Sequence, residues 1–212
     1  MKVCEIFTSI QGESTHAGML CTFIRLSGCN LRCSYCDTKY AYDEGAELSI
    51  ENVLERIEEA TIRLVEITGG EPLLQKDETA GLTTLLLDSG YNVLIETNGT
   101  LSIESIDGRA IMIMDVKTPA SGMSIKNNFS NFEYLKKVDE VKFVICDRND
   151  YIWAKNVVLE YGLPKRCTVL FSPAFGSLEP RKLVEWILED RVDVRLNLQL
   201  HKYIFGPDER RV

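Results

Sequence analysis

The sequence lacks any segment that could cross a membrane or direct export. No window approaches the ~18 to 20 consecutive apolar residues that a membrane span requires. The opening segment, MKVCEIFTSIQGE, is interrupted by polar residues too early to form the apolar core of a signal peptide. We therefore expect a cytoplasmic protein with no membrane contact, in a compartment where disulfide bonds are rare.

An excess of positive charge is also missing. The 24 Lys and Arg residues are outnumbered by 32 Asp and Glu residues, which gives a formal net charge of −8. Broad nucleic-acid binding needs a dense basic field, so this balance argues against it. Basic residues gather only in short stretches such as LPKRC and PDERRV. We expect no nucleic-acid partner.

A complete set of paired metal-binding motifs is absent as well. The chain has seven cysteines, an odd number that disfavours a fully paired disulfide framework, and only two histidines. There is one C-x2-C element, with no second one and no H-x3-H. Four cysteines, Cys4, Cys21, Cys146 and Cys167, lie in or beside apolar runs, which predicts that they are small core residues.

What the chain does contain is a regular alternation of two kinds of segment. Apolar runs, mostly continuous rather than alternating, predict parallel strands covered on both faces; they span residues 20–27, 63–68, 91–97, 110–116, 140–146, 167–172 and 192–199. Segments with helical spacing lie between several of them, at 49–60, 79–90, 149–162 and 178–190. Ser49 suits an N-cap, Gly90 follows the end of its helix, and Pro180 suits a first turn.

This alternation predicts an α/β fold with a largely parallel sheet. Six or seven strands are too few for a closed eight-stranded barrel, so we expect a partial (β/α) barrel of about six parallel strands in a single domain, residues 1–212. Polar or glycine-rich residues follow most strands, where such folds gather their chemistry. The irregular segment 117–135 is either a loop over the active site or an inert surface excursion.

Three cysteines are crowded into the loop GCNLRCSYCDT, with the spacing C-x3-C-x2-C. Cys29, Cys33 and Cys36 offer soft thiolate ligands that suit zinc or an iron–sulfur cluster. Structural zinc would need a fourth ligand, for which Asp37 or His16 is available. The favoured interpretation is a 4Fe–4S cluster with one iron free of protein ligands, because an open position lets substrate reach a catalytic metal.

This loop resembles the motif of the radical S-adenosylmethionine superfamily. An aromatic residue, Tyr35, precedes the last cysteine, and TGGEP at 68–72 resembles the superfamily's glycine-rich motif. The resemblance implies that S-adenosylmethionine chelates the open iron and that one-electron reduction yields a 5′-deoxyadenosyl radical. No catalytic side chain is then expected, because the radical comes from the cofactor and the protein positions it.

A closer resemblance extends over essentially the whole chain. EIFTSIQGES, CDT, ITGGEPLLQ, IETNGT, DVKTP, VKFVI and LQLHKYIFG are similar to segments of the 7-carboxy-7-deazaguanine synthase family. The family implies a carbon–nitrogen lyase of queuosine and deazapurine biosynthesis, which converts 6-carboxy-5,6,7,8-tetrahydropterin into 7-carboxy-7-deazaguanine with loss of ammonia. It also implies magnesium, S-adenosylmethionine used catalytically, a flavodoxin- or ferredoxin-like electron donor and a homodimer.

The resemblance assigns substrate contacts to seven residues: Ile10, Gln11, Gly12, Glu13, Arg25, Thr68 and His201. Gln11 offers a donor and an acceptor to a pterin edge, and Glu13 can accept from its amino groups. Arg25 lies in an apolar run, where a cation needs an anion; a substrate carboxylate and a structural ion pair are the alternatives. A plain turn at QGE and a structural role for His201 also remain open.

Further positions match the family's cofactor and metal sites. Thr38 matches its magnesium ligand, and oxygen donors suit that ion. The residues that match its S-adenosylmethionine contacts are Tyr35, Cys36, Asp37, Gly70, Glu71, Asp115, Val116, Lys117, Ser172, Pro173, Ala174 and Phe175. In some members the end of the chain touches substrate just after HK…P; here DERRV follows Pro207, so no such contact is expected.

Two other functions compete with the synthase. A small radical S-adenosylmethionine activase of a glycyl-radical enzyme would share the cysteine loop, but it gives no reason for IQGE, Arg25 and QLHK to occur together. A non-catalytic zinc or iron–sulfur module would bind metal without chemistry. Iron content after anaerobic reconstitution separates the module from both enzymes.

Overall fold

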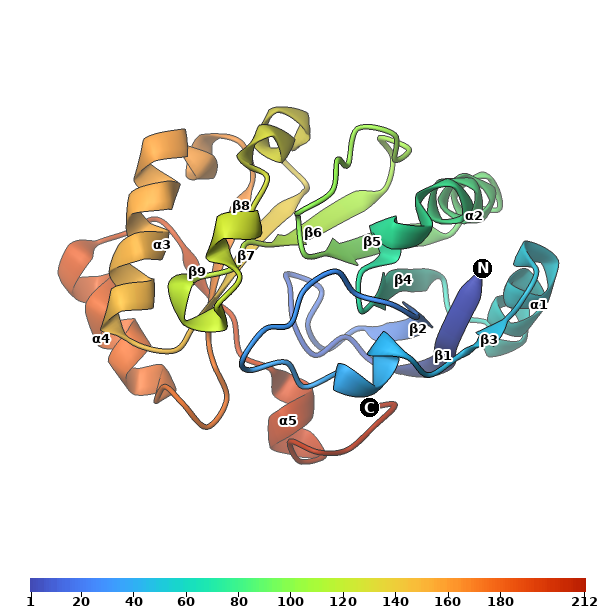
Figure 1. Ribbon diagram of the computed structural model, residues 1–212, viewed down its shortest axis with the longest axis horizontal. Helices are drawn as coiled ribbons and strands as arrows, with labels where there is room; N and C mark the ends of the chain where they lie inside the picture. Colours follow the sequence, from blue (N-terminus) through green and yellow to red (C-terminus); the bar gives the residue numbers. More distant parts are fainter.

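A single nine-stranded sheet runs through the computed structural model, which describes residues 1–212. Its order is β3-β1-β2-β4-β5-β6-β7-β8-β9, with β3 and β9 at the two edges. The seven strands from β2 to β9 in this order are parallel, whereas β1 is antiparallel to both β2 and β3. The sheet is therefore open, as expected for a partial barrel (Figure 1).

The strands follow the apolar runs closely. Their bounds are β1 Lys2–Ile10, β2 Leu20–Leu26, β3 Ala46–Glu47, β4 Leu64–Gly69, β5 Asn92–Thr97, β6 Ile111–Asp115, β7 Glu140–Ile145, β8 Thr168–Pro173 and β9 Arg195–Leu196. Two departures stand out. The sequence did not predict β1, and the run at 192–199 forms only a two-residue edge strand whose residues are exposed.

Five α-helices accompany the strands: α1 Ile50–Ala60, α2 Lys76–Asp88, α3 Arg148–Tyr161, α4 Pro180–Asp190 and α5 Leu200–Ile204. Ser49 is the N-cap of α1, and its hydroxyl accepts a hydrogen bond from the Asn52 amide at 3.2 Å. Helix α2 begins three residues before the predicted start. The pair α1 and α2 lies near one end of the sheet and the pair α3 and α4 near the other (Figure 1). No helix has the length and apolar character that crossing a membrane would require.

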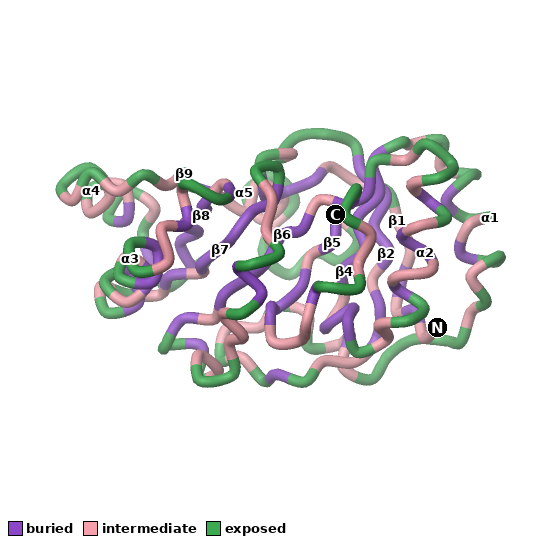
Figure 2. Tube along the Cα trace, turned by 90° about the horizontal axis from the view of Figure 1, so that it is seen from above, coloured by how far each residue is buried: buried purple, intermediate pink, exposed green.

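The core extends along the helix-covered face of the sheet. One cluster joins β2, β4 and β5 to α1 and α2, and a second joins β7 and β8 to α3. Figure 2 shows the buried residues concentrated along the strands. Cys21 and Cys167 are buried as predicted, but the prediction is wrong for Cys4 and Cys146, which are only partly buried because they lie at a β-bulge and just beyond the end of β7.

The opposite face of the strands carries a different set of side chains. Alternate residues of a strand point to opposite faces, so Phe23 and Arg25 share one face of β2, and Ile113 and Asp115 share one face of β6. Phe23 and Ile113 belong to a small apolar cluster, while Arg25 and Asp115 follow them toward the carboxyl ends of the strands. This face therefore changes from apolar to charged along the strands.

Candidate active site

A cavity of about 250 Å³ opens at the carboxyl ends of the parallel strands. All seven predicted substrate contacts line it, and so do the three clustered cysteines and Thr38. These residues come from positions as far apart as Ile10 and His201, yet the fold gathers them around one space. Parallel strands explain this convergence, because their carboxyl ends meet at one edge of the sheet.

The cysteine loop connects β2 to a 3-10 turn at Lys39–Tyr42. Gly28 begins the loop with a φ of +94°, and its amide donates to the Ala41 carbonyl at 2.8 Å. Ser34 anchors the other side: its amide and hydroxyl donate to the Ser121 and Ala120 carbonyls at 3.1 and 2.7 Å. The irregular segment 117–135 therefore holds the loop in place, which favours the active-site interpretation of that segment.

The three thiols can serve as the ligands of an iron–sulfur cluster. All three are free and partly exposed to the cavity, and no group of three or more His, Cys, Asp or Glu residues is arranged around one ion. In a four-iron cube each thiolate binds a different iron, so the ligands need not converge on one point. Burial raises the pKa of Cys29 and Cys33, and Lys117 opposes this in part.

Two buried polar atoms near the cysteine loop lack partners. The Tyr35 hydroxyl and Asp115 Oδ1 make no hydrogen bond, although both residues line the cavity. Buried polar groups are nearly always paired, so these atoms suit a polar ligand beside the thiols. The other oxygen of Asp115 forms an ion pair with Lys117 Nζ at 3.0 Å. The donor set fits an iron–sulfur cluster together with a polar molecule such as S-adenosylmethionine.

The glycine-rich turn after β4 packs directly on the cysteine loop. A Cβ at Gly70 would lie 2.2 Å from the Gly28 carbonyl oxygen and 2.8 Å from Cys29 Cβ. Glu71 does not line the cavity. Its carboxylate accepts from the Leu73 amide, the Thr97 hydroxyl and the Asn98 amide at 2.9, 2.7 and 2.7 Å. Gly70 thus permits close packing, and Glu71 fixes the turn to the end of β5.

The predicted substrate turn is tied down by its own side chains. Gln11 Nε2 donates to Glu66 Oε2, and Gln11 Oε1 accepts from the Glu13 amide at 2.9 Å. Gln11 therefore orders the turn and has only part of its hydrogen-bonding capacity left for a ligand. A Cβ at Gly12 would lie 2.0 Å from His201 Nδ1, so the absence of a side chain there admits the histidine.

Arg25 forms the structural ion pair, and its contact with a substrate carboxylate stays a prediction. Its Nε donates to Glu5 Oε1 at 2.8 Å, which is the structural ion pair. Its two terminal nitrogens make no hydrogen bond, and the residue lines the cavity. Glu5 thus holds one edge of the guanidinium and leaves the edge that can bind a carboxylate in a bidentate manner. Burial opposes the charge, but Tyr40, Glu5 and Glu96 together raise the pKa of Arg25.

Thr38 lies beside a carboxylate at the same cavity. Its hydroxyl donates to Asp37 Oδ1 at 2.9 Å, and Asp37 Oδ2 accepts from Lys202 Nζ of α5 at 2.5 Å. Helix α5 is therefore attached to the cysteine loop. Hydroxyl and carboxylate oxygens are hard donors of the kind magnesium prefers.

Not every predicted cofactor contact reaches the cavity. Its lining includes Tyr35, Cys36, Asp37, Gly70, Asp115, Lys117, Ala174 and Phe175, but excludes Glu71, Val116, Ser172 and Pro173. Val116 is buried among core residues, and the Ser172 hydroxyl accepts from Asn197 Nδ2 at 2.8 Å. These side chains support the strand ends from behind the cavity.

Four charged or amide residues of the cavity were missed by the sequence reasoning: Glu66, Glu96, Lys142 and Gln199. A signal for three of them exists. Each is a charged residue in a strand otherwise rich in apolar residues, as Arg25 is, and each lies on the cavity-lining face of its strand. Burial and Glu96 raise the pKa of Glu66 well above its usual range, so Glu66 retains its proton more readily than an exposed carboxyl.

The tail after α5 also departs from expectation. Val212 lines the cavity, although the residues after Pro207 suggested that the end of the sequence lies elsewhere. Arg210 pairs with Glu44 at 3.1 Å, and Arg211 Nε donates to Glu5 Oε2 at 3.3 Å. These contacts turn the tail back over the N-terminal strands, an arrangement that a local sequence pattern does not predict.

Comparisons with known sequences agree on one kind of enzyme. The sequence model of the Radical SAM superfamily matches residues 23–111. The 7-carboxy-7-deazaguanine synthase of Chlorobaculum tepidum is 45% identical, and the alignment covers 100% of this chain and 97% of that protein. The synthases of Koribacter versatilis and Clostridium acetobutylicum are 41% and 39% identical, with 100% of this chain and 100% and 99% of those proteins covered.

Solved structures show the same fold. The crystal structure of QueE from Escherichia coli has a TM-score of 0.80 at 24% identity, covering 94% of each chain. That of Streptococcus suis SuiB has a TM-score of 0.57 at 15% identity and covers 83% of this chain and 48% of that one. At these identities the likeness concerns the arrangement of the elements alone.

Proposed function

We propose a role for each cavity residue on the premise that this chain belongs to the 7-carboxy-7-deazaguanine synthase family, within the radical SAM superfamily. Its reaction is the ring contraction of 6-carboxy-5,6,7,8-tetrahydropterin to 7-carboxy-7-deazaguanine with release of ammonia, which makes it a lyase. The relatives do not favour the activase of a glycyl-radical enzyme.

One observation carries the proposal. The three cysteines share a single cavity with the turn Gln11–Glu13, with Arg25 and with His201, although these groups come from opposite ends of the chain. When bound, the cluster and S-adenosylmethionine supply a radical that abstracts hydrogen from the substrate. Cys29, Cys33 and Cys36 hold the cluster. Asp115 and Lys117 bind S-adenosylmethionine, with Asp115 Oδ1 free to accept from it.

On the substrate side, two charged groups orient the pterin. Arg25 binds its carboxylate through the two terminal nitrogens, since Glu5 already occupies Nε. Glu13 accepts from the amino groups of the pterin. Its carboxylate is oriented by Lys142 and Gln199, each at 2.8 Å. Although burial opposes ionisation, Lys142 holds the pKa of Glu13 below its usual range, so Glu13 is an anion at neutral pH.

His201 and Thr68 complete the substrate contacts. Burial lowers the pKa of His201, although Glu13 opposes this, so the imidazole is neutral at neutral pH and presents one donor and one acceptor. Thr68 Oγ1 donates to Glu96 Oε2 at 3.3 Å and leaves its oxygen as an acceptor toward the cavity. Helix α5, held by Lys202, and Phe175 limit the access of water from the open side.

Magnesium dependence is part of the proposal and centres on Thr38. The Thr38 hydroxyl, in the segment CDT, would be the side-chain ligand of a magnesium ion, as the family motif implies. The ion would neutralise charge on the substrate carboxylate beside Arg25. Thr38→Ala should abolish the response of the rate to added magnesium; a variant with full rate and full magnesium response would exclude this role.

Anaerobic reconstitution followed by assay tests the function as a whole. The expected result is about four irons and four sulfides per chain, and conversion of 6-carboxy-5,6,7,8-tetrahydropterin to a product with the ultraviolet spectrum of a deazaguanine. Replacing Cys33 with Ala should remove both the cluster and the activity. A reconstituted protein that cleaves S-adenosylmethionine but never forms the deazaguanine would refute the substrate assignment.

Four further properties belong to the same proposal. One sheet joins strands from both ends of the chain, which supports a single domain over residues 1–212. Free thiols in all seven cysteines suit the reducing cytoplasm, and a flavodoxin- or ferredoxin-like protein would donate the electron there. We propose a homodimer on the family resemblance, and sedimentation of the reconstituted protein tests it.

A further inference from the structure

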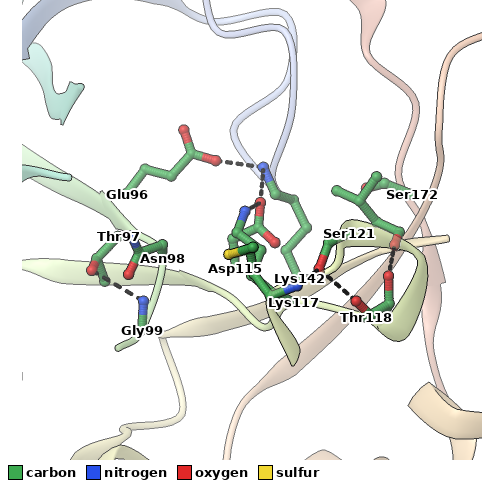
Figure 3. Close-up of polar contacts among 12 residues, drawn as sticks. Glu96, Thr97, Asn98, Gly99, Asp115, Lys117, Thr118, Ser121, Lys142 and Ser172 are labelled. Carbon is green, nitrogen blue, oxygen red and sulfur yellow. Dashed lines mark hydrogen bonds and ion pairs between the residues drawn. The ribbon is translucent and has the colours of Figure 1, made fainter. Parts of the chain in front are cut away.

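Lys142 lies at the centre of the polar side of the cavity. It belongs to β7 and is only 4% exposed, yet it carries a charge. Its ammonium group donates to Glu13 Oε2 at 2.8 Å and to Glu96 Oε1, and it faces Asp115 Oδ2 at 3.6 Å. Figure 3 shows Lys142 reaching toward Glu96 and Asp115.

The three carboxylates come from three separate parts of the chain. Glu13 follows β1, Glu96 is near the end of β5, and Asp115 ends β6 beside Lys142 in the strand register. Among the ion pairs, no cation other than Lys142 contacts Glu13 or Glu96, whereas Asp115 also has Lys117. The positions of Glu13 and Glu96 therefore depend on Lys142 in a way that the position of Asp115 does not.

A buried ammonium is unfavourable unless its donors are paired, and the same holds for the carboxylates around it. If the lysine charge were removed, Glu13 and Glu96 would face each other's charge without compensation and would move apart or take up protons. Either response would change what the cavity offers to a ligand, because a protonated carboxyl donates at the oxygen where a carboxylate accepts.

We propose that Lys142 is a positioning residue for the pterin, which holds the carboxylates of Glu13 and Glu96 as a correctly spaced pair of acceptors for the donor-rich edge of the substrate. This inference rests on the proposed function. The exocyclic amino group and the ring N–H groups of a reduced pterin are donors, so a matching wall must consist of acceptors. Asp115 extends the same row toward the cofactor and keeps Lys117 as its own partner.

Replacement of Lys142 in the reconstituted holoenzyme tests the inference. Lys142→Met keeps an unbranched side chain one atom shorter than lysine and removes the charge, and Lys142→Arg keeps the charge. For Lys142→Met we expect KM for the carboxytetrahydropterin to rise roughly 10- to 100-fold, the range for a charged hydrogen bond. Lys142→Arg should recover most of the affinity. Slow cleavage of S-adenosylmethionine in the absence of pterin should change by less than about threefold, because Lys117 still pairs with Asp115.

A matched control separates this role from general stabilisation. Lys155 also forms a partly buried ion pair, with Asp190 at 2.8 Å, but it lies between α3 and α4 and does not line the cavity. Lys155→Met should therefore leave KM unchanged. A KM for Lys142→Met within twofold of wild type would overturn the inference, as would equal KM values for the Met and Arg variants or an equal loss of cleavage without pterin.

A second variant covers the case in which Lys142→Met does not fold. Glu96→Gln/Lys142→Met removes one carboxylate together with the lysine, so less charge is left uncompensated. Its KM should still exceed that of Glu96→Gln alone by about tenfold, because Glu13 still loses its cationic partner and keeps only Gln199; equal values would overturn the inference. Failure of the wild-type enzyme to form product would instead refute the proposed function, so the two failures are distinguishable.

Discussion

Gly12 is the residue whose missing side chain allows the substrate turn and α5 to meet. A Cβ at this position would overlap His201 Nδ1, at 2.0 Å, and would lie 2.8 Å from His201 Cγ. The Leu200 amide also donates to the Gly12 carbonyl at 2.8 Å, so the histidine cannot withdraw without disturbing α5. Small displacements of binding groups are costly for catalysis, because reacting atoms must be held closely in position.

Gly12→Ala should therefore lower kcat/KM by about 10- to 100-fold through displacement of His201, while iron content stays the same. Steady-state assays of the reconstituted variant measure this. Gly108→Ala is the matched control, because a Cβ at Gly108 meets nothing within 4 Å. Equal kinetics for Gly12→Ala and the control would show that His201 does not need its present position.

The protonation of a single residue, Glu66, makes the free energy of unfolding depend on pH. Burial, with Glu96, raises its folded-state pKa well above the usual range, whereas the unfolded chain has an ordinary value of about 4.3. Above about pH 4.3 the unfolded state loses this proton and the folded state keeps it until its own pKa. The contribution of Glu66 to the free energy of unfolding therefore falls as pH rises through that window.

Glu66→Gln should remove this contribution, because glutamine mimics the protonated carboxyl and can still accept from Gln11. The stability of the variant relative to wild type should increase with pH above about 4.3, by about 1.4 kcal/mol for each pH unit in the window. Urea unfolding at several pH values measures it. Glu58→Gln, on the exposed side of α1, is the control; a pH-independent difference for Glu66→Gln would contradict the assignment.

The residues missed by the sequence reasoning share one physical cause. Arg25 was recognised as a cation in an apolar run, and Glu66, Glu96 and Lys142 lie in comparable runs. Because alternate residues of a strand point to opposite faces, their positions put all of them on the cavity-lining face. Which face lines the cavity is known only once the neighbouring strands are in register. Individual runs showed where strands occur, and the sheet was needed to show which charges face one another.

At the scale of elements, short sequence signals were sufficient to predict where several helices begin and end. The N-cap Ser49, the first-turn Pro180 and the left-handed Gly90 after α2 mark helix ends as their chemistry requires. β1 was missed because its polar residues interrupt the apolar pattern, and it owes its place to pairing with β2 over seven register positions. Non-local pairing of this kind leaves little trace in one segment.

Helix α2 offers a test of local conformational preference. Gly81 lies in its interior, and a Cβ there would be 3.9 Å from Ile50 Cδ1, an ordinary contact. Gly81→Ala should raise the free energy of unfolding by about 0.5–1 kcal/mol, because alanine loses less backbone entropy in a helix. Chemical denaturation of the reconstituted protein measures the change.

Gly90, just after the same helix, is the matched contrast. A Cβ there meets nothing within 4 Å, but the backbone has a φ of +81°, where side chains are strained. Gly90→Ala should lower stability by about 1 kcal/mol. If both substitutions shifted stability in the same direction, backbone conformation would not be the cause.

At the scale of the whole molecule, the cavity is closed by residues from both ends of the chain. Glu5 of β1 accepts hydrogen bonds from Tyr40, Arg25 and Arg211. It therefore joins β1 to β2, to the turn after the cysteine loop and to the tail. Arg210 lies 3.5 Å from the Tyr40 ring centroid and pairs with Glu44. Residues separated by more than two hundred positions meet because α5 and the tail return from the β9 edge of the sheet to β1, which no local pattern predicts.

Deletion of residues 207–212 should affect binding far more than stability. Arg210 and Glu44 are about half exposed, at 48% and 55%, and such pairs contribute only about 0–1 kcal/mol. The deletion also removes Val212 from the cavity wall and one donor from Glu5, which holds Arg25. We expect KM for the pterin to rise about 3- to 30-fold, because one hydrogen bond to Glu5 and the cavity contact of Val212 are lost.

Steady-state assays and thermal melts of the truncated holoenzyme separate these effects. Arg211→Gln, which breaks only the contact with Glu5, should account for part of the rise in KM, and Arg181→Gln, in an exposed pair on α4, for none. Because the tail acts on the substrate side, cleavage of S-adenosylmethionine without pterin should persist in the truncated enzyme. An unchanged KM after deletion would mean that the tail only covers the cavity, and that Glu5 positions Arg25 without help from Arg211.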